Sequence, residues 1–283
     1  MAIIDGKHVS DLIRDELKDE IAKINEQGDI IRLAVIIVGK DPASEIYVRN
    51  KIKACEYVGI ESLCYTFPEN VFEEEILSLI DKLNNDESVY GILVQLPLPN
   101  HLNKERILNK INVCKDVDGF SAYQAGRLFL GENALVSCTP KGIIELLHRY
   151  NIDLVGKNAV VIGRSNIVGK PTAMLLMQNN ATVTVCHSRT TNLAEYTKKA
   201  DIIVLAVGKP QFLTSDMIKD GVVVIDAGIN RVNGKLCGDS DFEAIKDKCS
   251  FITPVPGGVG PMTVTMLLKN TLQSYYSTHN ARN

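Results

Sequence analysis

Short aliphatic runs alternate with helical segments along most of this 283-residue chain. The run Leu33–Val38 has no polar alternation, which is typical of a parallel strand covered on both faces. From Ser10 to about Gln27 the aliphatic residues recur at helical spacing, and Gly28 marks the end of this helix. Such alternation predicts βαβ units, a parallel sheet and an α/β fold. Ligands of such sheets bind beyond the carboxyl ends of the strands.

The length and the order of the elements indicate two domains. In an N-terminal α/β domain over residues 1–138 we expect a mostly parallel sheet, with strands and helices at 33–38, 42–57, 61–67, 73–83 and 90–95. Residues 139–260 predict a Rossmann-like domain, with strands at 158–162, 182–186, 202–206 and 222–226 and a helix at 170–178. A helix over 139–150, with Thr139 as its N-cap, leads into this domain. The last helix, about 261–283, is expected to pack back onto the first domain.

Composition excludes several classes of protein. The net charge is −3, which is not typical of a nucleic-acid-binding protein. The longest aliphatic run is far shorter than the roughly 20 apolar residues that span a bilayer, and the N-terminus lacks the apolar core of a signal peptide. Seven cysteines without a CxxC indicate buried, reduced thiols and a cytoplasmic protein. The five histidines are scattered, so we expect no metal site.

The segment Gly163–Thr172 follows a predicted strand and opens a predicted helix. As a P-loop it would be one residue too long, and Pro171 occupies the Ser/Thr position. As a dinucleotide turn it has Ser165 in place of the second glycine, and its third glycine is displaced. The strand–turn–helix context favours the dinucleotide turn, because a helix N-terminus presents free N–H groups to phosphate. A glycine turn needed only for backbone geometry is the alternative.

The choice of nucleotide is read at the end of the second strand of this domain. An NAD enzyme usually carries an acid there, whereas this chain has His187, Ser188 and Arg189. Arg164, Ser188 and Arg189 could surround a 2′-phosphate with positive charge and hydrogen-bond donors. The sequence therefore predicts NADP rather than NAD.

Four more polar residues belong to the predicted ligand edge of the first domain. Tyr47 and Lys51 share a helical face with Ser44, and Gln95 ends a strand. Each residue alone has an ordinary structural explanation: a half-packed tyrosine, a solvated lysine, a surface amide, and, for Asp118, a turn residue. Their occurrence together, with a dinucleotide domain following, favours a functional site.

The segments Tyr47–Lys51, Val94–Pro99, Lys115–Gly119 and Pro254–Thr263 together resemble the bifunctional methylenetetrahydrofolate dehydrogenase/cyclohydrolase family. The resemblance covers nearly the whole chain. It implies a catalytic, folate-binding first domain, an NADP-binding second domain and a homodimer formed through the latter. The implied reactions are the oxidation of 5,10-methylenetetrahydrofolate with NADP and the hydrolysis of the 5,10-methenyl product to 10-formyltetrahydrofolate. They belong to the one-carbon metabolism that supplies purine biosynthesis.

The resemblance also implies roles for the polar residues of the first domain. Lys51 would be the acid and base of the hydrolysis, and Gln95 would hold it by a hydrogen bond. Tyr47 would pack on the substrate. Asp118 would anchor the pterin, whose neighbouring N–H donors suit a carboxylate.

Further contacts are implied in the second domain. The family's GRS turn falls on Gly163, Arg164 and Ser165, its HS pair includes Ser188, and a further nucleotide contact falls on Ile229. Near the C-terminus we expect the substrate to be bound by Pro256, Gly257 and Gly260, because a glycine-rich main chain can approach a flat ring closely. A tight turn where the chain returns to the first domain is the alternative.

Three alternatives stay open at this point. A monofunctional methylenetetrahydrofolate dehydrogenase would be indicated by a change at Lys51 or Gln95, and neither is changed. A two-domain dehydrogenase of a small hydroxy acid such as shikimate would not need the segments Val94–Pro99 and Pro254–Thr263. A non-enzymatic nucleotide-binding module would not need the polar site residues.

Overall fold

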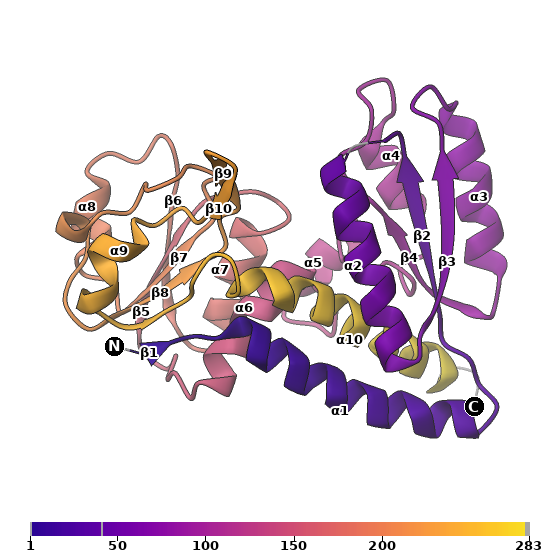
Figure 1. The fold of residues 1–283 in the computed structure, drawn as a ribbon, viewed down its shortest axis with the longest axis horizontal. Helices are drawn as coiled ribbons and strands as arrows, with labels where there is room; N and C mark the ends of the chain where they lie inside the picture. The colour runs from indigo at the N-terminus through magenta and orange to yellow at the C-terminus, as the bar shows by residue number, and fades with distance from the viewer. Residues whose placement is uncertain (1, 41, 281–283) are drawn as a thin grey trace. The chain divides into compact units, whose positions relative to one another are not determined.

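The computed structural model describes residues 2–40 and 42–280, without the side chains of residues 42–45 and 280. Its contacts group the chain into two compact units, Met1–Asp11 with Thr139–Thr263 and Leu12–Cys138 with Val264–Asn283. Both units are α/β and built on parallel sheets, as the sequence predicts (Figure 1). No helix within the described residues is long and apolar enough to cross a membrane.

The unit that contains Lys51 is built on a three-stranded parallel sheet in the order β3-β2-β4. Its central strand β2 is buried along most of its length and β4 is buried throughout, which explains their unalternating sequences. The strands are β2 (Arg32–Val38), β3 (Glu61–Phe67) and β4 (Val89–Val94). The helices that lie wholly or partly in this unit are α1 (Gly6–Glu26), α2 (Pro42–Val58), α3 (Glu73–Asn85), α4 (Lys104–Lys110), α5 (Ala122–Leu130) and α10 (Val259–Asn280).

The core of this unit holds the carboxyl ends of β2 and β4 side by side. Ile36, Ile76, Ile92 and Ile107 are completely buried in one cluster. Burying each such side chain contributes roughly 1.5–3 kcal/mol. Beyond the end of β4, the Gln95 N–H donates to Ile36 O at 2.9 Å. Gln95 therefore stands at the carboxyl edge of the sheet, where the sequence places it.

The other unit contains a six-stranded parallel sheet in the order β1-β11-β8-β7-β5-β6. The strands are β1 (Ala2–Ile3), β5 (Asn158–Ile162), β6 (Thr182–Cys186), β7 (Ile202–Leu205), β8 (Val222–Asp226) and β11 (Cys249–Ile252). A small antiparallel pair, β9 (Asn230–Val232) and β10 (Lys235–Cys237), follows β8. The helices are α6 (Cys138–Arg149), α7 (Gly169–Gln178), α8 (Leu193–Thr197) and α9 (Phe242–Ile245), with 3-10 turns at Ser215–Met217 and Lys246–Lys248.

The structure corrects three predicted helix starts. The first helix begins at Gly6 rather than Ser10, because the Asp5 carboxylate accepts the His8 N–H at 2.9 Å and caps it. Thr139 is not an N-cap: α6 already begins at Cys138, and the Thr139 hydroxyl pairs instead with the Thr263 hydroxyl at 3.0 Å. The last helix begins two residues before Pro261, which still lies in the first turn, where backbone N–H groups lack helical partners.

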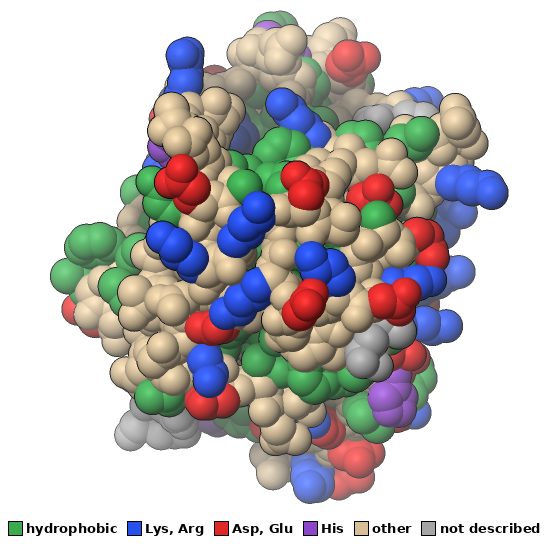
Figure 2. Space-filling view, turned by 90° about the vertical axis from the view of Figure 1, so that its left-hand side faces the viewer, with side chains coloured by type: hydrophobic (Ala, Val, Ile, Leu, Met, Phe, Trp, Pro, Cys, Tyr) green, Lys and Arg blue, Asp and Glu red, His purple; other side chains and the backbone are tan. Residues whose placement is uncertain are grey.

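The prediction that the cysteines are buried is wrong for part of the set. All seven are free thiols, and Cys64 and Cys114 are exposed, while Cys237 is half-buried. Cys64 lies in β3, where every residue is exposed or half-buried. Figure 2 looks onto the side that carries α8 and α9. Its described side chains show acids and bases intermixed, rather than one continuous basic surface.

Candidate functional site

Lys51 and Gln95 meet at the carboxyl edge of the three-stranded sheet. Lys51 lies in α2, the helix that follows β2, and Gln95 comes directly after β4. The Lys51 Nζ donates to Gln95 Oε1 at 2.9 Å. The Gln95 Nε2 donates to Leu96 O at 2.6 Å, which orients the amide so that its oxygen faces the lysine. Both side chains are half-buried, so the ammonium is held by a partner and still open to a ligand.

Tyr47 stands one helical turn before Lys51 on the same face of α2. Its side chain is 42% exposed, so a large part of the ring is free to pack against a flat ligand. Ser44, which the spacing places on this face, has a side chain outside the described residues.

Asp116 and Asp118 lie in one loop but differ in their hydrogen bonds: the first carboxylate is bonded to the backbone, and the second, within the described chain, is not. Asp116 is 1% exposed and accepts backbone N–H groups of residues 119–121 at 2.8–3.3 Å. Among the described residues, no backbone N–H donates to the Asp118 carboxylate. Its neighbour there is the Cys138 thiol, a weak donor, at 3.9 Å. Asp116 therefore shapes the loop, and Asp118 keeps its acceptor capacity for a ligand.

The surroundings of Asp118 change its acidity. Burial raises the pKa of Asp118 from 3.8 to about 6; the charge of Lys51 lowers it, that of Asp116 raises it and the Cys138 thiol lowers it. The effect of Lys51 means that its ammonium lies within electrostatic reach of this carboxylate. A carboxylate that is poorly solvated and lacks strong donors from the protein binds ligand N–H groups well, because these groups supply the missing hydrogen bonds.

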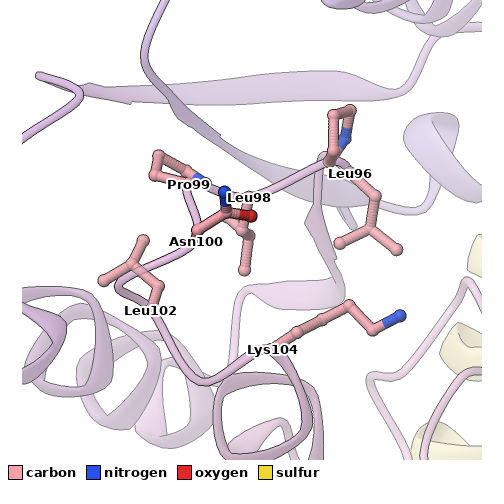
Figure 3. Close-up of a pocket in the computed structure, with 7 residues that line it drawn as sticks. Leu96, Leu98, Pro99, Asn100, Leu102 and Lys104 are labelled. Atoms are coloured by element: carbon pink, nitrogen blue, oxygen red, sulfur yellow. The ribbon is translucent and has the colours of Figure 1, made fainter.

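A cavity of about 490 Å³ opens directly after Gln95 (Figure 3). In the close-up, Leu96 and Lys104 flank it from different sides. The peptide bond between Leu96 and Pro97 is cis. Mostly apolar side chains line the cavity, with one amide and one ammonium: Leu96, Pro97, Leu98, Pro99, Asn100, Leu102 and Lys104. One continuous segment of the chain lines this open hollow, which the sequence did not predict.

The turn after β5 in the other unit leaves no room for side chains at two glycines. Gly163 has φ +138°, and a Cβ there would lie 2.4 Å from Ala206 O. A Cβ at Gly169 would lie 2.3 Å from Gly163 O. The Ser165 hydroxyl accepts the N–H groups of Val168 and Gly169 at 3.1 and 3.3 Å, which ties the turn to the start of α7. The turn thus places backbone without side chains, together with the N-terminus of a helix, at the carboxyl edge of the sheet.

One arginine lies within this turn, and a second follows the neighbouring strand β6. The Gly163 N–H donates to Cys186 O at 2.9 Å, so the turn with Arg164 lies beside the end of β6, which Ser188 and Arg189 follow. All three of these side chains are exposed, and no described carboxylate forms an ion pair with Arg164 or Arg189. The arrangement leaves two guanidinium groups and a hydroxyl for a phosphate.

Ile229 lies in the loop between β8 and β9 and is 51% exposed. The buried carboxylate of Asp226 holds this loop by accepting N–H groups of Gly228 and Asp239 at 2.9 and 3.0 Å. A Cβ at Gly228 would lie 2.3 Å from the Asp239 carboxylate. Two buried acids, which the sequence did not single out, therefore present Ile229 to the surface.

The segment that precedes α10 has an unusual backbone. The peptide bond between Val255 and Pro256 is cis, and Gly257 has φ +104°. At Gly260 a Cβ would meet nothing within 4 Å, so no packing constraint within the described chain requires a glycine there. That Pro256, Gly257 and Gly260 bind the substrate stays a prediction.

One unit has a glycine turn at the carboxyl edge of a Rossmann-like sheet, and the other has a lysine–amide pair. Together these features define a class: two-domain enzymes that use a nicotinamide nucleotide. Two family matches narrow this class. Residues 4–118 match the catalytic domain of tetrahydrofolate dehydrogenase/cyclohydrolase, and residues 137–279 match its NAD(P)-binding domain. The chain belongs to the tetrahydrofolate dehydrogenase/cyclohydrolase family, as the sequence motifs predict.

Full-length relatives share this architecture. The bifunctional protein FolD of Campylobacter hominis is 58% identical over 275 residues, which are 97% of each chain. The crystal structure of the bifunctional FolD enzyme of Campylobacter jejuni is 52% identical, with a TM-score of 0.97 over 98% of this chain and 99% of that one. The Trypanosoma brucei FolD, complexed with NADP cofactor and inhibitor, is 39% identical with a TM-score of 0.93 over 98% of each chain. These matches confirm the predicted family and fold class.

Proposed function

We propose that this protein oxidises 5,10-methylenetetrahydrofolate with NADP and hydrolyses the 5,10-methenyl product to 10-formyltetrahydrofolate. The observation that carries the proposal is the 2.9 Å bond between Lys51 and Gln95 in a chain of the dehydrogenase/cyclohydrolase family. Hydride transfer alone needs no lysine fixed as an acid and base. The intact pair therefore favours the bifunctional enzyme over a monofunctional dehydrogenase.

For substrate binding we assign the pterin to Asp118. Its carboxylate has free acceptor capacity, and the exocyclic amine and ring N–H of a pterin form a matching donor pair. Tyr47, exposed one turn from Lys51, provides a flat surface for the substrate. These two residues position the reacting carbon near the ammonium of Lys51.

For the nucleotide we assign the turn Gly163–Ser165 and Ile229, with Arg164, Ser188 and Arg189 around the 2′-phosphate. NADP, when bound, supplies the hydride acceptor of the oxidation. The residues fit this cofactor, because the turn offers bare backbone and the exposed guanidinium groups suit a phosphate dianion. The protein's own contribution to this step is orientation and the exclusion of water.

For the hydrolysis we assign proton transfer to Lys51. As the free amine, Lys51 takes a proton from the water whose oxygen bonds to the methenyl carbon, and it returns this proton to the ring nitrogen as the carbon–nitrogen bond breaks. The remaining hydroxyl proton leaves to solvent as the formyl carbon–oxygen double bond forms. Gln95 keeps the Nζ in place through both transfers, since its own amide is fixed on Leu96 O. The products are the 10-formyl group and the free ring amine.

The test is an absorbance assay of the purified protein with methylenetetrahydrofolate and NADP or NAD. Lys51→Met keeps the length of the side chain and removes the amine. Cyclohydrolase activity should fall by a factor of about 100 to 10,000, while dehydrogenase activity falls much less and methenyltetrahydrofolate accumulates. The matched control is Lys53→Met, which changes an exposed lysine two residues along the same helix. Hydrolysis by Lys51→Met at nearly the wild-type rate would remove the central role from this lysine.

We also propose that the protein is a homodimer of the cytoplasm and that its product supplies purine biosynthesis. The nucleotide-binding unit offers support for the dimer, because β6 is an edge strand with Val185 40% exposed, and Met177 of α7 is 50% exposed. Unpaired edge strands with apolar side chains are common sites of association. The free thiols agree with a reducing compartment.

A further inference from the structure

Asn270 is a fully buried amide on α10 and is not among the residues assigned to the site above. Its Nδ2 donates to Val117 O and to Val136 O, both at 2.8 Å. Because both neighbours are acceptors, the nitrogen rather than the oxygen of the amide has to face them. The two N–H groups of one side chain thus join two separate segments of backbone.

The first segment is the loop that carries Asp118, and the second is the stretch around Leu135 and Val136, which packs against this loop. Gly119 has φ +67°, and a Cβ there would lie 2.2 Å from Leu135 O, so the segments pack backbone against backbone. Val117 is completely buried and Val136 is half-buried, so this close packing limits the access of water to their carbonyls. A carbonyl shielded from water needs a hydrogen-bond donor, because leaving it unpaired destabilises the folded state. Asn270 is the shared donor.

Cys138 connects the same cluster to the Asp118 carboxylate. Its Sγ lies 3.6 Å from Val117 O and 3.9 Å from Asp118 Oδ1. The Asn270 Nδ2 lies 3.7 Å from this sulfur. The carbonyl just before Asp118 and the thiol beside its carboxylate are therefore both held by one amide.

We infer that Asn270 is a positioning residue for the folate site. It fixes the peptide between Val117 and Asp118, and through it the direction of the Asp118 carboxylate. Because Asp118 lacks strong donors of its own, nothing else of comparable strength among the described residues orients it. This inference rests on the role of Asp118 given under the proposed function, and it predicts an effect on folate binding that leaves the nucleotide site unaffected.

The test compares steady-state kinetics of the full-length wild type with those of Asn270→Leu, which keeps the shape of the side chain and removes both donors. The KM for methylenetetrahydrofolate should rise about 10- to 100-fold, as expected when a binding group is displaced by about 1 Å. The KM for NADP should not change, which also shows that the protein is folded. Asn270→Ser, which keeps one donor, serves as the milder variant and should give a smaller rise.

Ser274→Ala is the matched control. Ser274 lies one turn further along α10 and is equally buried. Its single hydroxyl proton is shared between Tyr90 O and Cys114 O, both 2.5 Å from Oγ, and Ser274 forms no hydrogen bond with Asp118 among the described residues. Its replacement should lower stability without raising the folate KM. The same rise in both variants would reduce Asn270 to a general packing role and overturn the inference.

A double-mutant cycle with Asp118→Asn separates a positioning role from a structural one. If Asn270 acts through Asp118, then Asn270→Leu should raise the folate KM in the wild type and not further in the Asp118→Asn background. Equal rises in both backgrounds would refute the inference and leave the proposed function intact. A wild-type protein without folate-dependent NADP reduction would instead refute the proposed function.

Discussion

Replacing Asp118 by Asn should stabilise the folded protein at neutral pH and leave its stability nearly unchanged in acid. The carboxylate is poorly solvated in the folded state, and burial raises its pKa from 3.8 to about 6. Below pH 3.8 the group is protonated in both the folded and the unfolded protein, so it imposes no ionisation cost. As the pH rises from 3.8 to 6 the unfolded chain loses the proton first, and the folded state becomes progressively less favoured.

The size of the effect follows from the difference between the two pKa values. One pKa unit corresponds to about 1.36 kcal/mol, so ionised Asp118 destabilises the folded state by at most about 3 kcal/mol above pH 6. The side chain is only partly enclosed, and solvent screening reduces this value. Asn has nearly the same shape and does not ionise. Asp118→Asn should therefore gain up to that amount at pH 8 and nearly none at pH 4.

Urea unfolding followed by far-ultraviolet circular dichroism measures both free energies, at pH 4 and at pH 8. Asp116→Asn is the matched control in the same loop. It should destabilise the protein at pH 8, because hydrogen bonds to a charged acceptor contribute about 1.5–3 kcal/mol and Asp116 accepts three from the backbone. A difference between Asp118→Asn and the wild type that is the same at both pH values would refute the reasoning.

Arg164→Ala should raise the KM for NADP about 10- to 100-fold, as for the loss of a charged hydrogen bond, and the KM for NAD much less; equal rises in steady-state kinetics would contradict the 2′-phosphate assignment. Light scattering at micromolar concentration should give the mass of a dimer, and a monomer mass would exclude one. Gly169→Ala should weaken NADP binding in a direct titration, because its Cβ would collide with Gly163 O. Gly260→Ala should raise the folate KM and stabilise α10 by up to about 1 kcal/mol; an unchanged KM would remove Gly260 from the substrate site.

The local pattern of apolar and turn residues was sufficient to predict most of the longer strands and helices of this protein. Strands such as Glu61–Phe67 and Thr182–Cys186 begin and end where the sequence predicts, because an aliphatic run bounded by turn residues is a local signal. The approach of Lys51 to Gln95 could also be predicted, since the carboxyl ends of parallel strands share one edge of the sheet. The short elements, among them β1 and α9, were missed because so few residues carry no periodic signal.

Tertiary structure alone decided which polar groups are structural and which are available. Asp116 and Asp118 are two residues apart and chemically identical, and only the fold of residues 119–121 gives the backbone N–H groups to the first and none to the second. The partners of Asn270 lie more than 130 residues away along the chain. Burial and hydrogen bonding depend on the neighbours that folding supplies, and contacts over such separations leave no pattern in the sequence around either residue.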